Sequence, residues 1–258
     1  MHIDVDRYYR EGGLLIDTPL KQKMVELRKI FTEVFDLIAS AHGQGPIRND
    51  ADITRLYRSD RRDLWVAAYD QLSNLPEVMA LCNEPCLQEA VKSIGFKRPA
   101  MPLRSVIRAD MPSDQKWDIS SHQDYVYHYG SNNSVTIWMP FQDTEVELGA
   151  LEVVWGTHLE GAKPQEKGIL KDVKGVKFES VPSTVGQALL FSQFLYHRSG
   201  KNSTDKIRFS IQIRFNDLGA QDYQKRNFYL NWDDLKKNDK DPAFATFFPV
   251  PERKPSKV

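Results

Sequence analysis

Apolar residues in the first 100 positions recur at helical spacing. From Pro19 to about Gly43 they fall three or four positions apart, so they share one face of a helix: Leu20, Met24, Leu27, Ile30, Phe31, Val34, Phe35 and Ile38. Shorter helices are predicted around 60–73 and 84–94. Their apolar faces need a partner surface, so residues 1–100 are predicted to be a mostly helical cover for a sheet.

From about Pro102 the pattern changes to short β-branched and aromatic runs separated by Gly, Asn, Asp and Pro. The predicted strands are 103–109, 118–125, 133–141, 148–154, 176–181, 186–192 and 206–215. So many short strands with turn residues between them are typical of a sandwich or jelly roll. We therefore expect one domain over 1–258, with an all-β jelly-roll core at 101–216 and a C-terminal extension at 217–258.

Composition narrows the class of protein. The 258 residues include 35 basic and 35 acidic side chains, and this balance does not favour a nucleic-acid or anionic-membrane surface. No apolar run reaches the roughly 18 residues of a membrane span, and the N-terminus lacks the pattern of a signal peptide. The only cysteines, Cys82 and Cys86, are expected to be reduced thiols. A cytoplasmic protein is predicted, and the sequence assigns no oligomeric state.

Candidate chemistry comes from two short motifs, His122-Gln123-Asp124 and the distant His197. Residues at i and i+2 of a strand share a face, so His122 and Asp124 can bind one ion while Gln123 points away. Two histidines and one carboxylate form the facial triad of non-haem Fe(II), although they also suit other divalent metals. Each motif alone has an ordinary alternative, a chance His-x-Asp or a histidine that caps a loop. Their conjunction favours a metal site.

The segment 207–215 alternates strictly between apolar and polar residues. One face carries Ile207, Phe209, Ile211, Ile213 and Phe215, and the other carries Arg208, Ser210, Gln212 and Arg214. The polar row could face solvent on a half-buried sheet. It could instead face the barrel interior, where the Arg208 guanidinium would suit a carboxylate. Periodicity does not say which face is inside, and from the residues alone the solvent-facing interpretation is favoured.

Together these residues resemble the phytanoyl-CoA dioxygenase-like branch of the Fe(II)/2-oxoglutarate oxygenases. The resemblance covers roughly Leu103 to Phe215 as ordered landmarks: His122-Gln123-Asp124, the tryptophan-bearing run Ser134 to Asp143, the run Gly149 to His158, and His197-Arg198-Ser199 followed by Arg208. Trp155 and Thr157 depart from the Pro and Ser that relatives carry around Gly156. The resemblance implies a double-stranded β-helix, the cupin-like jelly roll.

The same resemblance implies roles for individual residues. His122, Asp124 and His197 would bind iron, and Arg208 with Ser199 would hold the distal carboxylate of the co-substrate 2-oxoglutarate. Thr136 and Trp138 would lie beside that co-substrate, or would simply fill the barrel. O2 would be the oxidant, with succinate and CO2 as products. Related halogenases lack the carboxylate ligand, so Asp124 favours hydroxylation.

The substrate is expected to be a small molecule, with no nucleic-acid partner. Candidate pocket residues are Arg104, Arg108, Gln123, Tyr125 and His128. The two arginines have an alternative as surface ion pairs, which contribute little. A non-catalytic jelly-roll protein for ligand binding or regulation is the main rival, and it predicts a degraded triad or a lost arginine. A cupin-like isomerase is a second rival, but it would be expected to carry a His-x-His motif, which the chain lacks.

Overall fold

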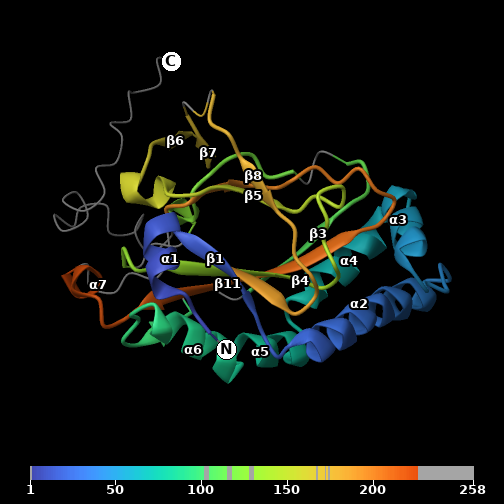
Figure 1. Ribbon diagram of the computed structural model, residues 1–258. Helices are drawn as coiled ribbons and strands as arrows, with labels where there is room; N and C mark the ends of the chain where they lie inside the picture. The colour runs from blue at the N-terminus through green and yellow to red at the C-terminus, as the bar shows by residue number, and fades with distance from the viewer. Residues whose placement is uncertain are drawn as a thin grey trace, which may run out of the picture.

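Two antiparallel sheets form the core of the computed structural model shown in Figure 1. The structure describes residues 2–225 except 102–104, 115–117, 128–130, 167, 172 and 174. The larger sheet has the order β1 (Gly13–Asp17), β9 (Gln187–Ser192), β4 (Val135–Pro140), β11 (Arg208–Asp217) and β2 (Pro99–Ala100), and β3 (Val106–Asp110) also pairs with β11. The smaller sheet has the order β10 (Tyr196–Arg198), β5 (Leu151–Val154) and β8 (Glu179–Val181). A separate hairpin joins β6 (Gln165–Glu166) to β7 (Ile169–Leu170).

The two sheets enclose a small apolar cluster. Trp138, Leu189 and Phe191 of the larger sheet pack there against Leu151 and Val153 of the smaller one. Figure 1 shows β5 and β8 lying across the larger sheet, as the two walls of a jelly roll do. The predicted all-β core with a helical cover, a double-stranded β-helix, is confirmed.

Helices cover the outer face of the larger sheet. In chain order they are α2 (Lys21–Ala41), α3 (Asp50–Arg58), α4 (Arg62–Leu72), α5 (Pro76–Cys82) and α6 (Pro85–Ser93). The short α1 (Val5–Glu11) precedes β1, and α7 (Gln221–Lys225) follows β11. Two short 3-10 turns, η2 (Asp124–Val126) and η3 (Thr157–Glu160), lie in the loops. Asn49 caps α3, since its side chain accepts the Asp52 N–H at 3.0 Å. None of the described helices is long and apolar enough to cross a membrane.

The contact between α2 and the sheet decides which face of β11 is inside the barrel. Phe31 of α2 is fully buried, with its ring centroid 4.7 Å from Phe141 and 5.7 Å from Phe209. Phe209 belongs to the apolar row of β11, so this row faces the helices. The polar row, Arg208, Ser210, Gln212 and Arg214, is also buried and faces the barrel interior.

Two predicted features are corrected by the structure. Residues 118–123 form no strand, and the predicted strand over 118–125 is wrong. His122 makes one isolated bridge, and Asp124 already begins η2. The ladder does not continue because the Gln123 N–H bonds to the side chain of Gln165, at 3.3 Å, and not to a neighbouring strand. The predicted helical cover also omits β1, which pairs with β9 through the whole of its length.

The structure also bears on the predicted thiols and on the predicted C-terminal extension. Cys82 and Cys86 are free thiols, as expected. The predicted C-terminal extension at 217–258 includes the end of β11 and α7, and its remainder, 226–258, lies outside the described residues.

Candidate metal centre

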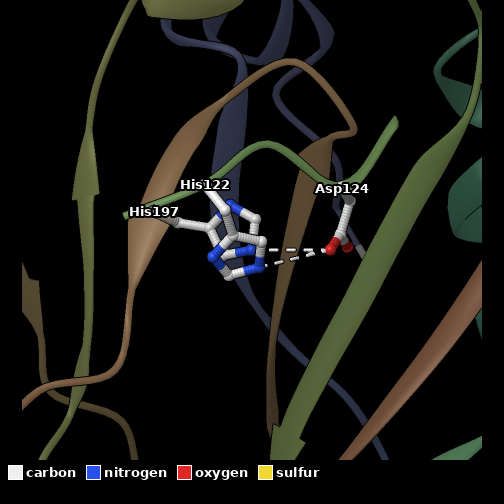
Figure 2. A group of neighbouring side chains, drawn as sticks. All are labelled: His122, Asp124 and His197. Atoms are coloured by element: carbon white, nitrogen blue, oxygen red, sulfur yellow. Dashed lines mark ion pairs between the residues drawn. The ribbon is translucent and has the colours of Figure 1, made fainter. Parts of the chain in front are cut away.

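Three buried side chains converge at one end of the barrel (Figure 2). The Nε2 atoms of His122 and His197 lie 3.6 and 3.7 Å from Oδ1 of Asp124, and the three candidate ligand atoms are all within 4.8 Å of one another. Each residue is at most 3% exposed. Ligand atoms about 2.1 Å from a shared ion lie roughly 3–4 Å apart, so the spacing suits one metal ion between them.

Local backbone structure brings the two histidines together. His122 and His197 form an antiparallel bridge, in which the His122 N–H donates to the His197 carbonyl at 2.9 Å and the reverse bond is 3.1 Å. Their ring centroids are 4.1 Å apart. His197 lies in β10, which pairs with β5, whereas Asp124 reaches the same point because η2 turns the chain immediately after Gln123.

Both imidazoles are oriented for metal binding by their other nitrogen. Nδ1 of His122 lies 2.9 Å from the Ser120 carbonyl, and Nδ1 of His197 lies 2.9 Å from the Leu195 carbonyl. A carbonyl only accepts, so each Nδ1 carries the hydrogen and each Nε2 presents a lone pair. This tautomer is the one that ligates through Nε2.

His197 is also neutral. Burial, with a further contribution from His122, lowers the pKa of its imidazole from 6.5 to about 3. The 3.7 Å contact from His197 Nε2 to Asp124 Oδ1, one of the two dashed lines in Figure 2, is therefore not an ion pair at neutral pH. Among the described residues nothing accepts from or donates to Nε2 of His197, although the atom is buried. A buried lone pair without a partner is costly, and a metal ion satisfies it. The residues present thus fit a divalent metal.

The second oxygen of Asp124 is held by neighbouring strands. Oδ2 accepts the Thr136 hydroxyl at 2.5 Å and Arg214 Nε at 3.2 Å. Arg214 Nη2 also approaches Oδ1 at 3.3 Å and donates to Gln212 at 2.6 Å. These contacts turn the carboxylate so that Oδ1 faces the histidines. Sequence reasoning missed Arg214, although its even spacing from Arg208 along the polar row was a signal.

Arg208, the predicted carboxylate anchor, lies inside the barrel and is 1% exposed. Its Nε and Nη2 donate to Asp110 of β3 at 3.1 and 2.6 Å, and its Nη1 donates to the Gly149 carbonyl. Gly149 has φ +81°, and a Cβ there would lie 2.7 Å from the Gly200 carbonyl. Glycine is therefore required where this loop passes close to the residues that follow His197.

The other predicted co-substrate residues are Ser199, Trp138 and Thr136. The Ser199 hydroxyl oxygen accepts the Ile119 N–H at 3.2 Å, which leaves its own hydrogen to donate. Trp138 is 1% exposed and packs with Leu189 and Phe191 inside the barrel. Thr136, as described above, contacts the Asp124 carboxylate.

The predicted substrate residues are only partly brought to the metal cluster. The Gln123 amide is used by the backbone, donating to Gly161 and Phe194 at 2.9 and 2.6 Å and accepting from Lys163 at 2.8 Å. The Tyr125 hydroxyl donates to the Lys163 carbonyl at 2.6 Å. Gln123 and Tyr125 therefore tie the ligand-bearing segment to the loop after η3. Arg108 lies in β3 beside Asp110. Arg104 and His128 lie outside the described residues.

A jelly roll with two histidines and one aspartate gathered at its end has the ligand set associated with non-haem iron oxygenases. Residues 10–210 match the family described as "Phytanoyl-CoA dioxygenase (PhyH)", and the chain belongs to this family. None of the curated proteins matches the chain significantly.

Solved structures share the fold at low sequence identity. One is the "non-heme monooxygenase; ThoJ apo", with a TM-score of 0.61 and 19% identity over 83% of this chain and 76% of that chain. Another is the "non-heme alpha ketoglutarate dependent carbocyclase SnoK from nogalamycin biosynthesis", with a TM-score of 0.57 and 18% identity over 86% and 88%. A third is EctD from S. alaskensis "with 2-oxoglutarate and 5-hydroxyectoine", with a TM-score of 0.55 and 12% identity over 83% and 75%.

Proposed function

We propose that this protein is an Fe(II)- and 2-oxoglutarate-dependent dioxygenase that hydroxylates a small-molecule substrate. One observation carries the proposal: a buried, neutral His197 whose Nε2 has no partner among the described residues, facing His122 and Asp124 at ligand spacing. Membership of the dioxygenase family supports the same conclusion. Fe(II), 2-oxoglutarate and O2 are the cofactor and co-substrates that the proposal requires.

His122, Asp124 and His197 would hold the iron on one side and leave its remaining positions open for co-substrate and O2. When bound, the iron supplies the oxidation chemistry, in which 2-oxoglutarate is decarboxylated to succinate and CO2 and one oxygen atom passes to the substrate. Asp124 keeps the third ligand position filled by a carboxylate, and this supports hydroxylation over halogenation.

Arg208 would anchor the distal carboxylate of 2-oxoglutarate, with the Ser199 hydroxyl as a second donor. The guanidinium is inside the barrel and almost completely shielded from solvent, where a charged hydrogen bond is stronger than in water. Trp138 and Phe191 provide apolar walls that exclude water from the barrel. Thr136 and Arg214 position the Asp124 carboxylate.

The substrate would approach from the side of Tyr127. Its ring centroid is 5.7 Å from that of His122, and Tyr127 is 43% exposed while the three candidate ligands are buried. One structural neighbour is named a carbocyclase, so the product has to be identified in the test.

The proposal is tested by anaerobic reconstitution with Fe(II) and 2-oxoglutarate, followed by exposure to oxygen with a panel of metabolites. We expect substrate-dependent succinate release and a product heavier by one oxygen atom. His197→Gln removes one ligand atom and is expected to abolish Fe(II) binding, whereas His42→Gln changes an exposed histidine beyond α2 and should bind as the native protein does.

Each outcome has a clear meaning. A native protein that binds neither Fe(II) nor 2-oxoglutarate contradicts the proposal and leaves the non-catalytic jelly-roll protein as the better description. Succinate release with a cyclised or epimerised product would retain the cofactors and replace hydroxylation by that reaction. Equal Fe(II) affinity in His197→Gln and His42→Gln would show that the ligand assignment is wrong.

A further inference from the structure

Arg208, the proposed anchor of the co-substrate, is already paired with a carboxylate of the protein itself, that of Asp110. Asp110, the last residue of β3, lies opposite Arg208, the first residue of β11. Its Oδ2 accepts from Nε and Nη2 of Arg208, at 3.1 and 2.6 Å, while its Oδ1 accepts from Nη2 of Arg108 at 2.7 Å. The Asp110 side chain is 5% exposed, and those of Arg208 and Arg108 are 1% and 15% exposed. One buried carboxylate thus bridges two guanidinium groups.

The cluster of Arg108, Asp110 and Arg208 has a formal net charge of +1. Burial on its own would raise the pKa of the Asp110 carboxyl, but the charges of Arg208 and Arg108 outweigh this effect and hold the pKa below its ordinary value. Asp110 is therefore ionised at neutral pH. The exposed Asp118 also interacts electrostatically with all three groups and offsets part of this charge, and an incoming carboxylate would neutralise the remainder.

Arg208 has hydrogen-bonding capacity for that additional carboxylate. A guanidinium carries five N–H groups, and the contacts within the described residues use three of them, two to Asp110 and one to Gly149. An incoming carboxylate can use the others, but it must then share the positive charge of Arg208 with Asp110. Two carboxylates on the same guanidinium repel each other strongly in a buried site.

We propose that Asp110 is a resident counter-ion of the co-substrate site: it holds Arg208 in place before the co-substrate binds and limits the affinity for the distal carboxylate afterwards. Arg108 acts in the opposite direction, because it draws the charge of Asp110 away from Arg208. This inference rests on the proposed function, in which Arg208 anchors 2-oxoglutarate. Asp110 and Arg108 are positioning residues that set the affinity.

The inference predicts opposite effects from two nearby substitutions. Asp110→Asn keeps a similar shape and an oxygen acceptor for Arg208 but removes the competing charge, so 2-oxoglutarate should bind at least tenfold more tightly. Arg108→Gln removes the second partner of the Asp110 carboxylate, whose charge then acts on Arg208 alone. In that variant 2-oxoglutarate should therefore bind at least tenfold more weakly. If Asp110 served only to orient Arg208, Asp110→Asn would weaken binding.

Binding is measured by calorimetry on Zn(II)-loaded protein, because zinc has no redox chemistry and no turnover can occur. The second probe is 2-oxopentanoate, which has the same chain length as 2-oxoglutarate without the distal carboxylate. Its affinity should be unchanged in both variants, which separates an effect on the distal carboxylate from a general loss of structure. Asp63→Asn and Arg61→Gln make the same charge changes in an exposed pair on and beside α4, and they should leave both affinities unaltered.

The outcomes separate a failure of the proposed function from a failure of the role assigned to Asp110. Binding of 2-oxopentanoate but not of 2-oxoglutarate to the native protein, or binding of neither, contradicts the proposed function and the inference with it. Native binding of 2-oxoglutarate with unchanged or weaker binding in Asp110→Asn overturns the inference alone. If Asp110→Asn does not fold, Arg108→Gln decides, because it keeps the Arg208–Asp110 pair, and unchanged 2-oxoglutarate affinity in that variant refutes the role of Asp110.

Discussion

The hydroxyl of Thr136 is expected to contribute directly to metal affinity. Thr136 and Asp124 are 0% and 1% exposed, and the hydroxyl donates to Oδ2 of Asp124 at 2.5 Å. Thr136→Val keeps the shape of the side chain and removes only this donor. The carboxylate can then rotate toward Arg214, which already contacts both of its oxygens, and Oδ1 no longer faces the two histidines.

A hydrogen bond to a charged group contributes about 1.5–3 kcal/mol. Because about 1.4 kcal/mol corresponds to a factor of ten in an equilibrium constant, the metal affinity of Thr136→Val should fall by roughly 10- to 100-fold. Losses of this size are typical when a hydrogen-bond partner of a metal ligand is removed.

The affinity is measured by anaerobic Fe(II) titration against a competing chelator. Thr144→Val is the matched control, since Thr144 is also fully buried and its hydroxyl donates to a backbone carbonyl, that of Gln142, at 3.0 Å. Both variants should lose some stability to urea, but only Thr136→Val should lose metal affinity. Metal binding by Thr136→Val at the native affinity would refute the argument that this hydroxyl orients the ligand.

Three further substitutions test the fold around the site. Phe31→Ala should lower the free energy of unfolding by about 3–5 kcal/mol, because the fully buried ring packs between α2 and the sheet, whereas Leu37→Ala, at a side chain 71% exposed on the same helix, should change it by less than about 0.5 kcal/mol in urea denaturation. Gly149→Ala should be more destabilising than Gly43→Ala, because both glycines have positive φ but only at Gly149 would a Cβ meet backbone. Calorimetry should also show weaker 2-oxoglutarate binding by Gly149→Ala. Equal stability of the two variants would contradict this prediction. Gln123→Leu should cost at least about 2 kcal/mol in the same denaturation assay, because three buried hydrogen bonds to backbone groups are lost, and a native-like midpoint would contradict that role.

Much of the architecture could be predicted from local pattern alone. The helix at α2 and the strands β4, β9 and β11 follow from apolar periodicity and turn residues, which act over a few positions. β1 could not be predicted in this way. Its run of apolar residues is short and follows α1 directly, and it becomes a strand because β9, far along the chain, offers it a ladder.

The three candidate ligands lie close together, as the sequence predicted, but the predicted reason was partly wrong, and their metal binding stays a prediction. Strand alternation would have placed His122 and Asp124 on one face, whereas the structure brings them together through an isolated bridge to His197 and the η2 turn. Arg214 and Asp110 were missed because their importance depends on what lies opposite them across the sheet. No local pattern contains that information.

The sequence by itself determined the residue types that could serve as ligands, the alternation that separates the two faces of β11 and the family resemblance. Only the tertiary structure decided which face of β11 is inside, because the answer depends on Phe31 of α2 covering the apolar row. It likewise decided that Arg208 shares its charge with Asp110, 98 positions away in the chain. That pairing is set by the register of β3 against β11. Burial then gives these contacts their energetic weight, because charges removed from water must find their partners within the fold.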